Sequence, residues 1–131
     1  MKDLKSYIEA KTFEDEVGKR LSALCVGDEI IVKEHLFASD RLRCDYYLPL
    51  GCKAKQWPNN TIVEVKSYFR YASISRLYEQ YYPLHIKGVI SKLVIIVDDT
   101  ISENVKTFVS LFKSPFIEII GYHELELIDI P

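Results

Sequence analysis

Two carboxylates and a lysine occur in a pattern that can bind a metal ion. Glu64 and Lys66 interrupt the apolar, β-branched run "TIVEVKSYF" of residues 61–69, and Asp45 lies in the preceding extended segment, residues 42–50. Residues two apart in a strand share a face, so Glu64 and Lys66 are neighbours, and antiparallel pairing of the two segments brings Asp45 beside them. Buried charges are costly unless compensated. A divalent cation held by both carboxylates compensates them, and the alternative is a simple Glu64–Lys66 ion pair near a sheet edge.

The surrounding pattern predicts a layered α/β domain. Apolar residues recur at helical spacing in some segments, and β-branched runs bounded by turn residues mark others. The expected helices cover residues 7–24, 73–82 and 102–112, and the expected strands cover residues 29–37, 42–50, 61–69, 92–97 and 116–120. The order α-β-β-β-α-β-α-β implies an antiparallel meander followed by parallel crossovers, in a mixed sheet with helices on both faces.

Composition limits the class of protein. The 131 residues, 48% apolar and 27% charged, fit a single globular domain over residues 1–131. We expect a cytoplasmic protein with no membrane partner, because the chain has no apolar run of about twenty residues and its N-terminus is too polar for a secretory signal. A net charge of −2 means that any nucleic-acid contact must use a local basic patch.

The cysteines and histidines do not suggest a metal site. Cys25, Cys44 and Cys52 are odd in number and lack the close spacing of a zinc knuckle, which argues against a disulfide framework and a structural metal. We expect them to be core or surface thiols. The three histidines are spread over separate predicted elements, which disfavours histidine-based catalysis.

The segments "RCDYYLP" and "VEVKSY" resemble the motif of the PD-(D/E)XK nuclease superfamily, in which an acid on one strand is followed by an acid-x-lysine triplet on the next. That family has a restriction-endonuclease-like α-β-β-β-α-β core, so the resemblance covers nearly the whole chain, with an α-β unit added at the C-terminus. Cys44 stands where the family name has proline. The resemblance implies a DNA endonuclease that uses Mg²⁺, with Mn²⁺ as a substitute, and leaves 5′-phosphate and 3′-hydroxyl ends.

By the same resemblance, Asp45, Glu64 and the backbone carbonyl of Val65 would hold the metal, and Lys66 would orient the attacking water. Such a domain can serve restriction, defence, repair or mobile-element systems, as a homodimer or joined to a sensor or DNA-reading domain. Two other functions stay open: a non-catalytic module that binds nucleic acid or protein, and a junction-specific resolvase.

The first helix offers a further acid for this site. Family members often carry one there, and "TFEDEVGKRL" contains Glu14, Asp15 and Glu16. On a helical wheel, Glu14 flanks the apolar stripe more closely than Glu16, and Asp15 faces away. The stripe consists of Phe13, Val17, Leu21 and Leu24. Glu14 is therefore the favoured candidate and Glu16 the alternative, although acids early in a helix also interact favourably with its dipole without any catalytic task.

Basic and aromatic residues near the motif are candidates for DNA contact. Arg70 follows the lysine closely, and Arg76 lies on the next predicted helix. Lys53, Lys55 and Trp57, in the loop before residues 61–69, could touch a groove or stack on a base. The alternative for each is an ordinary solvated surface position.

Overall fold

The sequence folds around a mixed sheet. The computed structural model describes residues 4–37, 41–66, 71–97, 107 and 116–125. Five strands lie in the order β1-β4-β5-β6-β7. Their bounds are β1 Val32–Lys33, β4 Tyr46–Leu48, β5 Thr61–Lys66, β6 Lys92–Val97 and β7 Ile117–Gly121. Neighbours from β1 to β5 run antiparallel, and β5, β6 and β7 run parallel. The predicted meander followed by parallel strands is thus confirmed.

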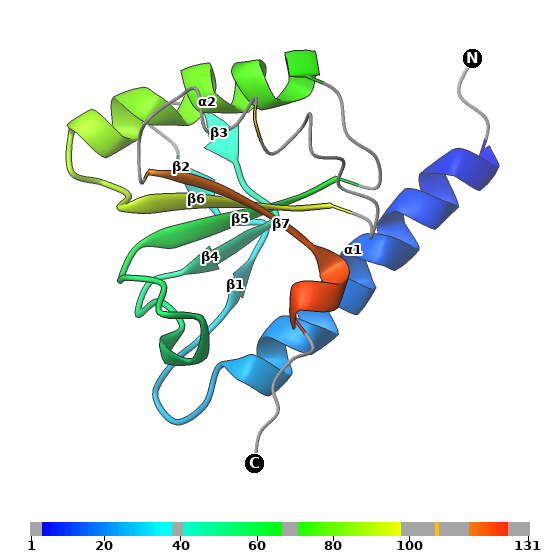
Figure 1. Ribbon diagram of the computed structural model, residues 1–131, viewed down its shortest axis with the longest axis horizontal. Helices are drawn as coiled ribbons and strands as arrows, with labels where there is room; N and C mark the ends of the chain where they lie inside the picture. The colour runs from blue at the N-terminus through cyan, green and yellow to red at the C-terminus, as the bar shows by residue number, and fades with distance from the viewer. Residues whose placement is uncertain (1–3, 38–40, 67–70, 98–106, 108–115, 126–131) are drawn as a thin grey trace.

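One helix covers each face of this sheet. Helix α1, Leu4–Leu24, lies across one face, and α2, Tyr71–Ile86, lies across the other (Figure 1). The predicted apolar stripe of α1 does face the sheet, since Val17 and Leu21 are fully buried. Residues of β5 alternate between the layers: Val63 packs with α1, and Ile62 packs with α2. Alternate residues of β5 therefore face α1 and α2.

The predicted strands 29–37 and 42–50 are each broken in two. β1 ends at Lys33, and β2, Leu36–Phe37, pairs with β3, Leu42–Arg43, in a separate two-stranded sheet. The physical reason is a bend at Glu34, whose φ of 52° is outside the range of extended backbone. Phe37 and Cys44 consequently belong to the core on the α2 side, and β2 and β3 lie near α2 (Figure 1).

Helix α2 is longer than predicted. It passes through Pro83, where the sequence suggested a stop at Tyr82, and ends at Ile86. Proline removes one helical hydrogen bond, but Leu84, one residue later, is buried in the core and Lys87 donates its N–H to the Pro83 carbonyl at 3.1 Å. Burial of the Leu84 side chain offsets the lost bond.

Two short 3-10 helices complete the described chain: η2, Lys53–Lys55, and η3, Tyr122–Leu125. The helix predicted over 102–112 lies outside the described residues except for Thr107, which is helical. In the described part of the chain, neither long helix has the length and apolar content needed to cross a membrane.

Candidate active site

The candidate site forms where β4 and β5 separate. Tyr46 pairs with Val63, and the next position along brings Asp45 opposite Glu64. Beyond this point the backbone of Cys44 turns away and donates its N–H to the carbonyl of His35 at 3.0 Å. Oδ2 of Asp45 accepts the N–H of Val65 at 2.7 Å in place of a backbone acceptor. The Asp45 carboxylate is therefore fixed beside the end of β5.

Glu64 is a buried acid with a defined partner. Its side chain is 6% exposed, and its Oε2 accepts a hydrogen bond from the Tyr81 hydroxyl of α2 at 2.8 Å. Burial, and next the negative charge of Asp45, raise the pKa of Glu64 to about 8. Burial also raises the pKa of Asp45, although the hydrogen bond from Val65 opposes that shift. The two acids thus form a pair that resists ionisation unless a cation is near.

Lys66 lies beside both acids without pairing with either. Its positive charge lowers the pKa of Asp45 and of Glu64, but within the described residues it forms no ion pair at 4.0 Å or less. The simple Glu64–Lys66 ion pair, the alternative that the sequence left open, is therefore not what the structure contains. Among the described residues, no acid holds the ammonium group in an ion pair.

Glu14 approaches the site from α1. Burial raises its pKa first, and the charge of Asp45 raises it further, which places the two carboxylates within electrostatic reach. Oε2 of Glu14 is buried without a hydrogen-bond partner among the described residues, and the nearest cation, Nζ of Lys11, is 3.6 Å away. Glu16, by contrast, is exposed and pairs with Lys19 at 3.7 Å. The geometry favours Glu14 over Glu16 as the third acid.

A polar cavity of about 370 Å³ opens over Glu64 between β5, β3 and α2. Its charged lining consists of Glu64, Lys66, Arg41, Arg43 and Arg76. An acidic floor under a basic rim suits a phosphate group that reaches a metal ion. Arg76 was expected here from the sequence. Arg41 and Arg43 were missed, because their segment pairs with β2 in a separate sheet instead of continuing straight into β4.

Lys53, Lys55 and Trp57 do not line this cavity. Arg70 is outside the described residues. Lys53 and Lys55 are in η2, before the first residue of β5, so they lie at the opposite end of that strand from Lys66. Nζ of Lys55 donates to the carbonyl of Glu124 at 2.9 Å.

The prediction that Trp57 stacks on a base is wrong for this conformation. Its side chain is 4% exposed and packs in the core on the α1 side. A short bridge between Cys52 and Trp57 closes the loop and turns the indole inward. The large apolar area of the ring is better satisfied by burial than by solvent.

Comparison with known proteins adds no identification: no family model, no curated protein and no solved structure matches this chain. The functional interpretation depends on the geometry of the site.

Proposed function

We propose that this chain is a metal-dependent endonuclease of the PD-(D/E)XK type, which hydrolyses phosphodiester bonds in DNA and leaves 5′-phosphate and 3′-hydroxyl ends. The observation that carries the proposal is the convergence of Asp45, Glu64 and Lys66, of which Glu64 and Lys66 line an arginine-rich cavity. The strand order β1-β4-β5-β6, with α1 before it and α2 between β5 and β6, agrees with a restriction-endonuclease-like core and supports the same proposal.

The donor atoms at this site fit a hard divalent cation. Asp45 is held by the N–H of Val65 and Glu64 by the Tyr81 hydroxyl, and each contact uses one oxygen of a carboxylate that has two. The carbonyl of Val65 points to the same side of β5 as its N–H group, toward Asp45. Carboxylate and carbonyl oxygens are the ligands that Mg²⁺ and Mn²⁺ prefer. Glu14 would join through its buried Oε2, which forms no hydrogen bond with the described residues and lies 3.6 Å from Nζ of Lys11.

A bound Mg²⁺ would supply Lewis-acid stabilisation of the phosphate and a lowered pKa for a bound water. The chain supplies the positioning. Tyr81 fixes the orientation of Glu64, and the N–H of Val65 fixes Asp45. Lys66, which carries no carboxylate partner among the described residues, orients the attacking water and offsets the charge of the phosphate.

The arginines of the cavity would hold the flanking phosphates. Arg41 and Arg43 come from the end of the β2–β3 hairpin, and Arg76 comes from α2, so the cavity is bounded by cations on two sides. A planar guanidinium binds two phosphate oxygens at once and thereby fixes the orientation of the strand. These contacts carry no base specificity.

The test is a cleavage assay with a matched control. The purified chain is incubated with plasmid, linear duplex, a four-way junction, single-stranded DNA and RNA, in Mg²⁺, in Mn²⁺ and in chelator. We expect metal-dependent DNA cleavage that is lost in Glu64→Gln and kept in Glu118→Gln, a change at a partly exposed acid of β7 that pairs with Lys92.

The outcomes separate the candidate functions. Cleavage that survives in Glu64→Gln, or in chelator, contradicts the proposed site. Cleavage confined to the junction would assign a resolvase with the same chemistry. The wild type is assayed in Mn²⁺ at low protein concentration and at a concentration high enough for dimers to form. If it cuts none of the substrates at either concentration, the non-catalytic module is the better description.

A companion variant tests the role of Lys66. Lys66→Met should reduce cleavage by about 10²- to 10⁴-fold, the range for a group that assists proton transfer or charge stabilisation. Because Lys66 does not coordinate the metal, the Mn²⁺ affinity of the variant, measured by calorimetry, should stay near that of the wild type. Equal loss of affinity and turnover would make Lys66 a counter-ion of the acids instead.

A further inference from the structure

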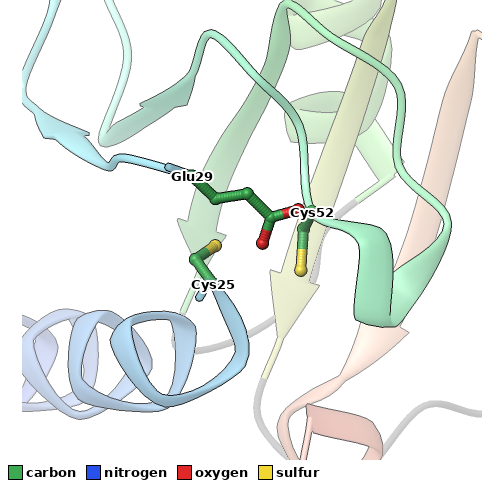
Figure 2. A group of neighbouring side chains, drawn as sticks. All are labelled: Cys25, Glu29 and Cys52. Atoms are coloured by element: carbon green, nitrogen blue, oxygen red, sulfur yellow. The ribbon is translucent and has the colours of Figure 1, made fainter. Parts of the chain in front are cut away.

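Three potential metal ligands converge at the end of the sheet opposite the candidate active site. Figure 2 shows Cys25 just after α1, Glu29 on the segment that leads to β1, and Cys52 at the start of η2. One ligand atom of each residue lies within 4.8 Å of the others. Both cysteines are buried. They are free core thiols, as expected, but their separation in the sequence gave no sign that Cys25 and Cys52 lie close together.

The Glu29 carboxylate is held between the two segments that carry the sulfurs. Its Oε1 accepts the N–H of Val26 at 3.0 Å, and its Oε2 accepts the N–H of Lys53 at 2.8 Å. Val26 follows Cys25, and Lys53 follows Cys52, so each hydrogen bond anchors one cysteine-bearing turn to the same carboxylate. Support of this kind orients metal ligands before the ion binds.

The two sulfurs belong to free thiols that lie close together without a disulfide bond. Two thiolates and a carboxylate gathered in a largely buried place are costly unless a cation compensates their charge. A divalent metal ion bound by all three would do so.

We propose that Cys25, Cys52 and Glu29 form a structural binding site for a thiophilic divalent cation of the Zn²⁺ class. In a tetrahedral zinc site, metal bonds of about 2.3 Å to sulfur and 2.0–2.2 Å to oxygen place the ligand atoms about 3.5–3.8 Å apart. The observed cluster reaches that spacing with small side-chain movements. Water would complete the coordination, and the ion would tie the end of α1 to the loop between β4 and β5.

This site differs from the candidate active site in place and in chemistry. Cys52 precedes β5 and Lys66 ends it, so the length of that strand separates the two groups. Thiolate ligands select Zn²⁺ and related ions over Mg²⁺. The proposal therefore stands or fails independently of the nuclease proposal.

Co²⁺ is the probe, because a thiolate–Co²⁺ bond gives a near-ultraviolet charge-transfer band that oxygen ligands do not give. Co²⁺ is titrated into the full chain after reduction and removal of metals. We expect the band to saturate at one ion per chain, to disappear when Zn²⁺ is added, and to persist in excess Mg²⁺. Zn²⁺ should also raise the melting temperature, since it binds only the folded cluster.

Matched variants locate the site. Cys25→Ser and Cys52→Ser should each lose most of the band. Cys44→Ser changes the third buried cysteine, which packs on the α2 side of the sheet, and should leave the band intact. Glu64→Gln should also leave it intact.

The proposal is overturned if the reduced wild type gives no band, if the band survives in Cys52→Ser, or if Cys44→Ser abolishes it equally. A chain that loses two hydrogens on exposure to oxidised glutathione, yet binds no Co²⁺ when reduced, would identify a disulfide pair and also reject the metal site. Should a serine variant fail to fold, thiol labelling of the wild type decides. Zn²⁺ must then slow labelling of Cys25 and Cys52 but not of Cys44.

Discussion

Glu64 is a buried acid whose ionisation should lower the stability of the fold. Its carboxyl group is buried in the sheet beside Asp45, and its folded pKa of about 8 exceeds the ordinary value of 4.5. Between these two pH values the folded chain keeps a proton that the unfolded chain has lost. Raising the pH therefore favours the unfolded state, and the stabilising effect of the protonated group, complete at low pH, is lost as the pH approaches 8.

Replacement of Glu64 by glutamine should remove this pH dependence. The free energy of unfolding of the metal-free wild type should fall with rising pH between about 5 and 8, by up to about 1.4 kcal/mol per pH unit from this residue. Glu64→Gln can still accept the hydrogen bond from Tyr81 but cannot ionise. Urea unfolding in chelator at several pH values measures the slope, which should be flatter in the variant. Equal slopes would mean that Glu64 is ionised at neutral pH.

Two substitutions of Asp45 separate the effect of its charge from the effect of its hydrogen bond. Asp45→Asn keeps an oxygen that can accept the Val65 N–H, whereas Asp45→Ala leaves that N–H without its acceptor. Both changes should abolish metal-dependent cleavage. Only alanine should carry the cost of a lost acceptor, about 1–3 kcal/mol, so unfolding of the asparagine variant should occur at the higher denaturant concentration. Cleavage by Asp45→Asn at the wild-type rate would exclude Asp45 as a metal ligand.

At the scale of elements, α1 reaches the sheet through a close contact at Gly18. A Cβ atom at this position would overlap the hydroxyl of Tyr46 and lie 2.9 Å from its ring carbon Cζ. The Tyr46 hydroxyl donates to the Glu14 carbonyl at 2.8 Å. The small residue therefore sets the separation at which α1 presents Glu14 to Asp45.

Gly18→Ala should destabilise the protein even though alanine favours helices. The gain in helix propensity, about 0.5–1 kcal/mol, is smaller than the 1–3 kcal/mol typical of overpacking. Tyr46→Phe removes the overlapping hydroxyl, so the alanine change should cost less in that background than alone, a coupling that a double-mutant cycle of urea midpoints measures. Ser22→Ala, at an exposed position of the same helix, is the control and should have little effect. If the destabilisations caused by Gly18→Ala and Tyr46→Phe simply add, α1 moves enough to avoid the overlap, and Gly18 does not set its distance from the sheet.

Elements with long apolar patterns could be predicted from the sequence, and those shaped by local backbone angles could not. Helical spacing of apolar residues marks α1, and apolar, β-branched runs mark β5 and β6; the meander then places Asp45 near Glu64. The bend at Glu34 depends on a positive φ that no residue preference signals. Because that bend carries Arg41 and Arg43 to the cavity, the basic rim of the site was not predicted either.

The same limit applies to Cys25 and Cys52. They belong to different elements, and their approach depends on how the end of α1 meets the loop after β4. The close cysteine spacing of a zinc knuckle arises when the ligands of a pair lie in one turn, and these two cysteines do not. A site assembled by tertiary packing leaves no such spacing.

At the scale of the whole molecule, an acidic chain presents a basic surface only locally. The net charge is −2, yet the cavity over Glu64 is lined by Arg41, Arg43, Arg76 and Lys66. Lys53 is also exposed, but it lies at the far end of β5. Binding of DNA should therefore depend on where a positive charge lies and not on the total charge.

Arg43→Gln and Lys53→Gln test this, because each removes one exposed positive charge. A labelled duplex is titrated in chelator, which prevents cleavage, over a series of salt concentrations, and anisotropy reports the dissociation constant. Arg43→Gln should weaken binding and reduce the slope of log K against log salt by about 1, the value for one lost phosphate contact. Lys53→Gln should leave both the affinity and the slope close to those of the wild type. Equal effects of the two variants would place DNA on a different face, and the cavity over Glu64 would then lose its role in holding the substrate.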